Sequence, residues 1–358
     1  MPLSPPRPAP TRFLTELSQM PAALDRLISY YEQDGRARLD DFRARAAGAS
    51  EIVASGMGTS RFAPEAIFPR LARRGVSCRT VDAGEWLHYG TGAPSATSLV
   101  ILTSQSGESV EVKRLVQEGR VASGFVAITN EQTSTLARAA GIAFPLLAGD
   151  EASISTKTYA NTLAVLHLLA AALEGPDAVE RGLRELRAAA RLLEDAPESA
   201  VMAAARAIAS GPGIAFVGRG PAYVAARQCA LTFMEGARCL TSAFTGGAFN
   251  HGPAETVDSG FPLVIFQATG RTRRLSETLA RRASTHGASV VVLTDESSAP
   301  IPGVAMVDVP RLRHAQDAEE LFPLLVCRVQ NLLLHHVAAE RGHEAGIFRY
   351  GEKVTAHE

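Results

Sequence analysis

Cysteine is scarce in this 358-residue chain, and the spacing of its four cysteines excludes two common kinds of site. No two of them form a Cys-x-x-Cys pair, which is the spacing that zinc sites and thiol redox motifs usually show. The simple interpretation is free thiols in a reducing compartment. We therefore expect no bound metal. The four residues are Cys78, Cys229, Cys239 and Cys327.

An excess of charge of either sign is also missing. Lys and Arg together number 36 and Asp and Glu 37, so the formal net charge is −1. Such a balance creates no general field that would attract a polyanion. The residues before the first predicted strand contain a modest helical pair without a concentrated basic face. We expect no nucleic-acid partner.

Long apolar runs are absent as well. Nowhere do 18 or more apolar residues follow one another without a charge, and residues 1–10 are rich in proline instead of carrying the apolar run of a secretory signal. We therefore expect a soluble cytoplasmic protein with no membrane partner. With 46% hydrophobic and 20% charged residues, the chain can build a packed core, and its length favours about two domains.

A strand followed by a glycine turn and a helix recurs along the chain. Residues 51–54 predict a short buried strand, and a polar glycine turn and a helical stretch over 63–74 follow it. Alternating strands and helices predict parallel sheets that are covered on both faces. The fold class is therefore α/β, with two similar doubly wound units. The other predicted strands are 98–102, 125–128, 213–218, 262–266 and 289–293.

Helical patterns complete the expected organisation. Residues 11–31 have amphipathic periodicity, and Pro21 should begin a new helix there. A long helix is expected over 318–341. The domain boundaries follow as an N-terminal helical segment (1–47), a first unit (48–175), a linking helix (176–210), a second unit (211–341) and a C-terminal tail (342–358).

Three loops concentrate hydroxyl side chains where a strand gives way to a helix or loop. They are Gly58-Thr59-Ser60, residues 104–109 (Ser-Gln-Ser-Gly-Glu-Ser) and residues 153–158 (Ser-Ile-Ser-Thr-Lys-Thr). At the carboxyl edge of a parallel sheet, such hydroxyls and the N–H groups of a helix start can bind a phosphate. One such loop is usually only a helix cap, whereas three together favour a site. Neither a nucleoside-triphosphate nor a clean dinucleotide glycine motif is present.

These loops belong to a longer series of motifs. With Gly218-Arg219-Gly220, Glu235, Asn250-His251-Gly252-Pro253 and Lys353-Val354-Thr355, they occur in the order and approximate spacing of the sugar isomerase (SIS) family. From about Ile52 onward the chain resembles the isomerase half of glucosamine-6-phosphate synthase and its free-standing deaminase and deglycase relatives. The resemblance implies two tandem SIS domains, with a sugar phosphate at the carboxyl edge of the first sheet.

The resemblance also implies roles for individual residues. Glu235 would move a proton between C1 and C2, His251 would assist ring opening, often from the neighbouring subunit, and Lys353 would form an imine with the open-chain ketose. It further implies a homodimer with a shared active site and no cofactor. The residues matched to the substrate and its phosphate are Gly58, Thr59, Ser60, Ser104, Gln105, Ser106, Ser109, Ser153 and Ser155.

The sequence by itself supports these three roles unequally. Glu235 ends an apolar helical segment, where burial would raise the pKa of a carboxyl group towards neutrality, although alone it would read as a surface glutamate. A lone loop histidine such as His251 is more often solvated. Lys353 lies near the end of the chain, and only a tail that folds back over the cleft could desolvate it enough to act as a nucleophile.

Two departures from the synthase shape the functional hypothesis. No glutaminase domain precedes the first unit, which excludes glutamine-dependent synthesis by this chain alone, and Thr232 stands where the synthase has a lysine. We expect an enzyme that converts glucosamine 6-phosphate and water to fructose 6-phosphate and ammonia without metal or redox cofactor. The alternatives are a fructosamine-6-phosphate deglycase, a simple aldose–ketose isomerase and a non-catalytic sugar-phosphate sensor.

Overall fold

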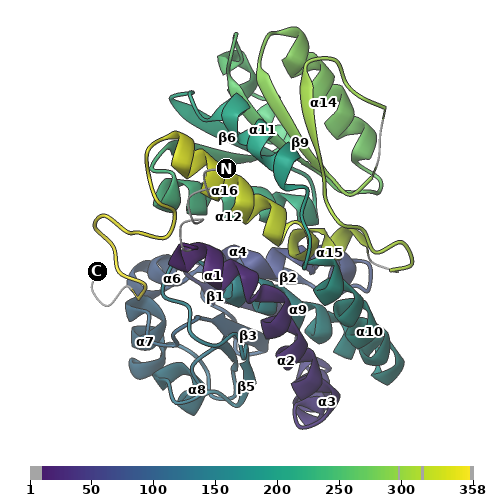
Figure 1. Ribbon diagram of the computed structural model, residues 1–358. Coiled ribbons are helices and arrows are strands. Elements are labelled where there is room, and N and C mark those ends of the chain that lie inside the picture. The colour runs from purple at the N-terminus through teal and green to yellow at the C-terminus, as the bar shows by residue number, and fades with distance from the viewer. Residues whose placement is uncertain (1–9, 297–298, 316–317, 355–358) are drawn as a thin grey trace, which may run out of the picture.

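Two five-stranded sheets, each parallel throughout, form the framework of the protein (Figure 1). The computed structural model describes residues 10–296, 299–315 and 318–354. The strand orders are β2-β1-β3-β4-β5 and β10-β9-β8-β6-β7. Read from the opposite edge, the second order repeats the first, with β6 in the place of β1. The predicted α/β fold with two doubly wound units is therefore confirmed.

The first sheet contains β1 (Glu51–Gly56), β2 (Cys78–Asp82), β3 (Ser98–Thr103), β4 (Val126–Thr129) and β5 (Ile142–Pro145). The second contains β6 (Gly213–Gly218), β7 (Leu240–Thr245), β8 (Pro262–Gln267), β9 (Ser289–Thr294) and β10 (Val304–Asp308). The sequence predicted the inner strands of both sheets and missed β2, β5, β7 and β10. All four are edge strands, and β2, β7 and β10 are largely half-exposed or exposed. In β2 and β7 the sequence has no continuous apolar run of the kind that marks a buried strand. In β5 and β10 it is mainly apolar but only four and five residues long, and such short runs are ambiguous.

Three helices precede the first sheet: α1 (Arg12–Ser18), α2 (Met20–Glu32) and α3 (Arg36–Ala46) (Figure 1). Helices α2 and α3 pack on α9, whereas α1 packs on α2 and α16. Pro21 occupies the first turn of α2, as predicted. The first unit then adds α4 (Thr59–Phe62), the 3-10 helix η1 (Ala63–Ala66), α5 (Phe68–Ala72), α6 (Ala83–Tyr89), α7 (Val110–Gln117), α8 (Thr135–Ala139) and α9 (Lys157–Ala172). The helix expected over 63–74 is thus divided, because Pro64 and Pro69 lack the N–H that a continuous helix requires.

The remaining helices are α10 (Pro176–Leu192), α11 (Glu198–Ile208), α12 (Pro221–Gly236), α13 (Gly246–Phe249), η2 (Pro253–Thr256), α14 (Arg273–Thr285), α15 (Ala318–Leu325) and α16 (Cys327–Glu340). The prediction of a single linking helix over 176–210 is wrong. This segment forms two helices, α10 and α11, and Pro197 lies directly before α11. The helix expected over 318–341 is also divided, at Val326 between α15 and α16.

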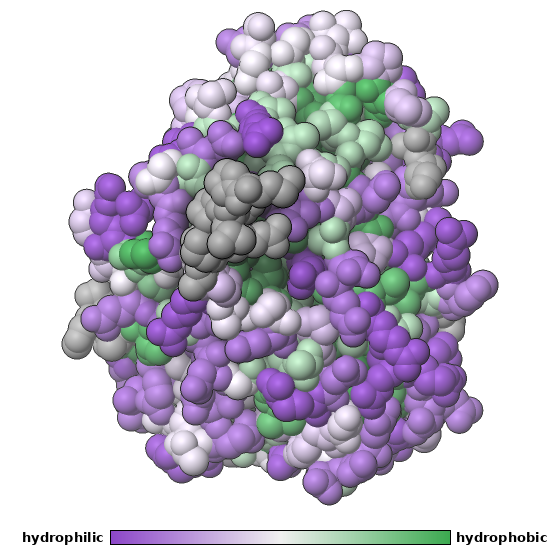
Figure 2. Space-filling view, viewed as in Figure 1, coloured by the Kyte–Doolittle hydropathy of each residue, from purple (hydrophilic) through white to green (hydrophobic). Residues whose placement is uncertain are grey.

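Helix α9 is the centre of the packing. All of its 16 residues are buried, and it packs against α2, α3, α10 and α15. One hydrophobic cluster runs from α1 and α2 through α9 to α12 and α16, so the two sheets share a core. The outer faces of the sheets have separate, smaller clusters. The surface seen in Figure 2 is mostly hydrophilic, with scattered apolar patches.

The segment Ala318–Glu340 is long and apolar enough to cross a membrane by length and composition. However, 83% of its most apolar window is buried inside the protein. It packs on α9, α11 and α12, which is what the core helix of an α/β unit does.

A buried network of charges joins the two units. The Arg70 guanidinium lies 2.7 Å from Glu174 Oε1 and 3.2 Å from Glu320 Oε1. His167 on α9 contacts Glu320 at 2.6 Å and Glu185 at 3.2 Å. Since Arg70 and Glu320 come from different units, the network fixes their relative position.

Replacing Glu320 by glutamine should lower the free energy of unfolding by about 3 kcal/mol, because it removes one partner from a buried ionic network. Urea unfolding measures the effect. Glu118→Gln is the matched control, since it breaks an exposed ion pair with Arg114 within one helical turn. We expect that control to cost less than about 1 kcal/mol. Equal costs for the two variants would contradict the role of the network.

His167 should make stability depend on pH. Burial lowers the pKa of His167, but hydrogen bonds to Glu185 and Glu320 raise it more, to about 9. The protonated imidazole therefore stabilises the fold fully below about pH 6.5, the unfolded value, and this contribution is lost as the pH rises towards 9. Urea unfolding in this range should show the loss, and His167→Gln should reduce it. An unchanged slope in the variant would refute the assignment.

Candidate active site

The loop after β3 has the geometry of an anion site. Ser104 is buried, and its hydroxyl lies 3.0 Å from that of Ser109. The backbone N–H groups of Gln105, Ser106 and Ser109 have no acceptor among the described residues. The loop ends at the start of α7, whose N-cap residue Ser109 makes no side-chain cap bond. Free N–H groups and serine hydroxyls at a helix start can bind a phosphate.

Neighbouring segments hold this loop in shape. The N–H of Gly107 donates to Ser104 Oγ at 3.1 Å, and the N–H of Asn130 donates to the carbonyl of Gln105 at 3.0 Å. Gly107 has φ +64°, and a Cβ there would lie 2.1 Å from Ser134 Oγ. Only glycine fits this position, so the loop conformation depends on it.

The loop after β1 lies along the same edge of the sheet. Gly58, with φ +51°, leads into α4, which starts at Thr59. The Thr59 hydroxyl donates to Gln228 Oε1 on α12 at 2.8 Å, so it links the two units. The Ser60 side chain is half-buried, and its hydroxyl has no hydrogen-bond partner in the described part of the chain. Ser60 is therefore freer than Thr59 to contact a ligand.

The corresponding loop of the second unit, after β8, is filled by the protein's own carboxylates. The N–H of Thr269 donates to Asp295 Oδ1 at 2.6 Å, and the N–H of Arg271 donates to Glu319 Oε1 at 3.1 Å. These two carboxylates accept hydrogen bonds from N–H groups that a bound anion would need, and their negative charge would repel an anion. The geometry thus favours the first unit for phosphate binding.

The segment before α9 contains two of the predicted substrate residues. The buried Ser153 donates its hydroxyl to Glu16 on α1, so that hydroxyl is already committed within the protein. Ser155 is half-buried, and its hydroxyl has no partner among the described residues. Lys157 from the same motif is buried and donates to Gln19 Oε1 at 2.7 Å and to the carbonyl of Asp150 at 2.6 Å. Its role here is to anchor the N-terminal helices.

Glu235 lies at the end of α12, beside this segment. A Cβ on the adjacent Gly236 would lie only 2.8 Å from Ile154 Cδ1, which shows how closely the two segments approach. The Glu235 side chain is half-buried. Burial raises the pKa of Glu235 to about 7, and the charge of Lys353 partly opposes this shift. A carboxyl group with a near-neutral pKa can both accept and return a proton at physiological pH.

The C-terminal tail folds back over the loop at residues 153–158. A Cβ on Gly346 would lie 3.0 Å from Ser153 Cβ, and Arg238 donates to the carbonyl of Ile347 at 3.2 Å. Further along, Lys353 Nζ lies 2.8 Å from Glu151 Oε2 and donates to the carbonyl of Ser153 at 2.7 Å. The tail therefore carries Lys353 into the first unit. Thr355 of the same motif lies outside the described residues.

Sequence analysis missed Glu151, the partner of Lys353. Its side chain is fully buried. It accepts hydrogen bonds from the N–H groups of Thr156 and Thr158 at 2.9 and 3.1 Å. Carboxylates are favoured at helix N-termini, but the sequence analysis did not predict α9, the helix that starts at Lys157. Nothing in the sequence, however, pairs residue 151 with residue 353.

The structure does not bring His251 into this group within one chain. His251 lies in the turn between α13 and η2, and its exposed imidazole has no hydrogen-bond or ion-pair partner among the described residues. Thr232 is buried and donates its hydroxyl to the carbonyl of Gln228 at 2.9 Å. It therefore supplies no amine in place of the lysine found in the synthase.

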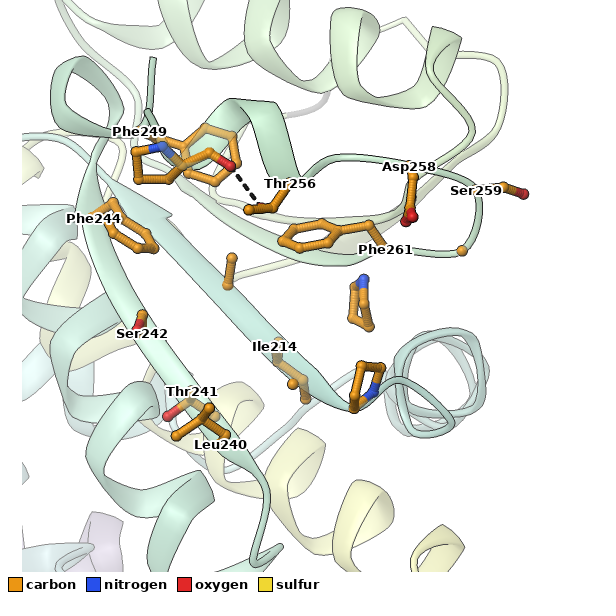
Figure 3. A pocket seen from close by; sticks show the side chains of 16 residues that line it. Ile214, Leu240, Thr241, Ser242, Phe244, Phe249, Thr256, Asp258, Ser259 and Phe261 are labelled. Carbon is orange, nitrogen blue, oxygen red and sulfur yellow. Dashed lines mark hydrogen bonds between the residues drawn. The ribbon is translucent and has the colours of Figure 1, made fainter. Parts of the chain in front are cut away.

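A cavity of about 690 Å³ lies elsewhere, in the second unit (Figure 3). Figure 3 shows the rings of Phe244, Phe249 and Phe261 around it, between β6, β7 and the loop at 258–261. Within the described part of the chain, Asp258 is its only ionisable lining residue, and none of the predicted site residues lines it. This cavity has no pair of acid–base groups, so the chemistry does not belong there.

Comparison with known proteins agrees with the repeated fold. The model of the SIS domain matches residues 47–172 and 208–335. The glutamine–fructose-6-phosphate aminotransferase (isomerizing) of Methanothermobacter thermautotrophicus is 27% identical over 278 residues, which is 75% of this chain and 45% of that protein. The corresponding protein of Zymomonas mobilis is 25% identical over 350 residues, 91% of this chain and 56% of that one. The chain thus spans about half the length of these relatives.

Solved structures share the fold at lower identity. The C-terminal domain of glucosamine-fructose-6-phosphate aminotransferase from Francisella tularensis has a TM-score of 0.81 at 21% identity and covers 96% of this chain and 99% of its own. Glucosamine-6-phosphate deaminase from Thermotoga maritima has a TM-score of 0.73 at 18% identity, with 96% and 99% covered. At these identities the likeness shows the fold alone. The SIS domain model matches two segments that together make up more than half of this chain. The chain therefore belongs to the SIS domain family.

Proposed function

We propose that the protein is a phosphosugar-converting enzyme that isomerises and deaminates an amino-sugar phosphate, with glucosamine 6-phosphate as the leading substrate. The observation that carries the proposal is the raised pKa of Glu235. Burial raises this pKa to about 7, and the positive charge of Lys353 partly opposes the shift. A sensor that only binds would need no proton carrier at this position. A relative named for fructose 6-phosphate and a structural neighbour named for glucosamine 6-phosphate support the choice of substrate.

In the proposed reaction the first unit binds the substrate, and Glu235 at the end of α12 transfers the proton. The serine-rich loop after β3 holds the phosphate, which fixes the distance from the anchor to C1 and C2 of the open chain. Glu235 removes the proton from C2 and returns it to C1, while one proton of the amine passes to O1. Together these transfers convert the aldehyde to an alcohol and the amine to a C2 imine. Lys353 replaces ammonia on C2, and water then releases the ketose. The products are fructose 6-phosphate and ammonia.

Ring opening needs a further acid–base group, and His251 is the candidate. Because its imidazole is exposed and unpartnered among the described residues, we propose that it completes the site of a second copy in a homodimer. Exposure of this kind suits a residue that acts across an interface.

Replacing Glu235 by glutamine should lower kcat by at least about a hundredfold, since proton transfer by a positioned group contributes about that factor or more. The assay follows ammonia and fructose 6-phosphate together, starting from glucosamine 6-phosphate. Glu194→Gln is the matched control, because Glu194 is exposed in the turn between α10 and α11. We expect the control to remain fully active.

Two outcomes of this assay would redirect the proposal. Saturable binding without turnover by the wild-type protein would favour a sensor. If glucosamine 6-phosphate does not react but a fructosamine 6-phosphate releases its amine, the deglycase is the correct function. In either case the role of the loop after β3 in phosphate binding would stand.

The pH dependence of kcat/KM tests the state of Glu235 directly. Its carboxylate must be unprotonated to remove the C2 proton, so activity should rise with pH through a value of about 7. If the base were an ordinary solvated glutamate, kcat/KM would rise near pH 4.5 instead. A rise at that low pH, with kcat/KM constant through neutral pH, would show that Glu235 is not the base.

A further inference from the structure

The ion pair between Glu151 and Lys353 joins residues that are 202 positions apart in the chain. Glu151 is the only carboxylate in direct contact with Lys353 Nζ among the described residues, at 2.8 Å. The second contact of Nζ is the carbonyl of Ser153 at 2.7 Å. An ammonium group has three N–H donors, so one of them remains for a ligand. The Lys353 side chain is still 18% exposed.

The surroundings of Glu151 keep its charge in place. Burial alone would raise the pKa of Glu151, but Lys353 and the hydrogen bonds from Thr158 and Thr156 lower it overall. The Thr156 and Thr158 hydroxyls donate to it at 3.0 and 2.5 Å, in addition to their backbone N–H groups. The carboxylate also sits at the N-terminus of α9, where the helix dipole favours a negative charge.

The other charged groups of the region have partners of their own. Glu16 on α1 accepts from the N–H groups of Ala152 and Ser153 and pairs with Arg12. Lys157 on α9 donates to Gln19 and to the carbonyl of Asp150. Arg26 on α2 donates to the carbonyl of Ala148. On α12, Glu235 faces Lys353 at longer range. Direct compensation of the Lys353 charge therefore falls to Glu151.

We propose that Glu151 is the buried counter-ion of the iminium that Lys353 forms with the substrate, an inference that rests on the function proposed above. Written from the ketose, as the reverse of the release step, the overall change converts R–NH3+ and O=C into R–NH+=C and water, so the positive charge on nitrogen is conserved. The partly exposed ammonium first gives up one proton to water, and the neutral amine attacks the C2 carbonyl. A proton returns from water to the departing hydroxyl, which leaves as water. Glu151 remains a carboxylate throughout.

This arrangement makes Glu151 a positioning residue that acts through Lys353. A carboxylate at hydrogen-bond distance favours the protonated iminium over the neutral imine. The protonated form makes C2 more electrophilic, so water adds to it and releases the ketose. Glu235 serves the earlier proton transfer between C2 and C1, so two carboxylates with different environments serve two different steps.

The test traps the iminium with cyanoborohydride, which delivers hydride to the protonated form and leaves a stable secondary amine. Fructose 6-phosphate is the probe, and mass spectrometry locates the adduct and measures its yield from about pH 5 to about pH 9. At alkaline pH the adduct yield should decline, and the pH at which it reaches half of its maximum is the upper midpoint. In Glu151→Gln this midpoint should fall by about one pH unit or more, with roughly tenfold less adduct at about pH 8.

Glu16→Gln is the matched control. Glu16 is a buried carboxylate that supports the same loop without touching Lys353, so loosening the loop by itself should leave the midpoint unchanged. Glu151→Asp keeps the charge and should lie closer to the wild type than Glu151→Gln does. Thermal unfolding monitors the fold of every variant.

The outcomes separate the two proposals. If the wild-type protein gives no adduct at Lys353, the imine and the counter-ion are both overturned. If wild type and Glu151→Gln give the adduct with the same midpoint, the counter-ion alone is overturned and the proposed function stands. If Glu151→Gln does not fold, Glu151→Asp decides: a smaller fall of the midpoint supports the counter-ion, and an unchanged midpoint overturns it.

Discussion

The burial of α9 on every side is the constraint on which the rest of the structure depends. A helix with no solvent-facing residue must be covered by other elements all round, and here α2, α3 and α10 cover it together with α15 from the second unit. The two sheets therefore share one core and cannot behave as independent domains. The same burial places the N-terminus of α9 inside the protein, where its free N–H groups need an acceptor. Glu151 supplies that acceptor, and Lys353 balances its charge.

The two repeats have the same topology but contribute different parts of the site. Each turns from its first strand into a helix at a glycine with positive φ, +51° at Gly58 and +54° at Gly220. After that point they differ. Among the described residues, the first repeat leaves backbone N–H groups without an acceptor in its loop after β3, whereas in the second repeat Asp295 and Glu319 accept from the loop after β8. The second repeat instead contributes α12, whose last turn carries Glu235.

Local pattern accounts for much of the fold and for part of the site. Inner strands are buried on both faces, so their apolar runs are visible in the sequence. Edge strands such as β2 and β7 are largely half-exposed or exposed and have no such run. The loop over 104–109 follows a predicted strand, and together with the other two hydroxyl-rich loops it indicated an anion site. Glu235 was identified by the family resemblance, and burial does raise its pKa.

By itself, then, the sequence determined the α/β class, the repeat, the inner strands and the position of the polar loops, because these depend on neighbouring residues in the chain. Only the tertiary structure decided that Ser153 donates to Glu16, that Thr59 binds Gln228 and that Glu151 pairs with Lys353. Each of these contacts joins residues more than a hundred positions apart. Their energies come from the desolvation of charges and polar groups, which depends on what the folded chain places around them and not on their sequence neighbours.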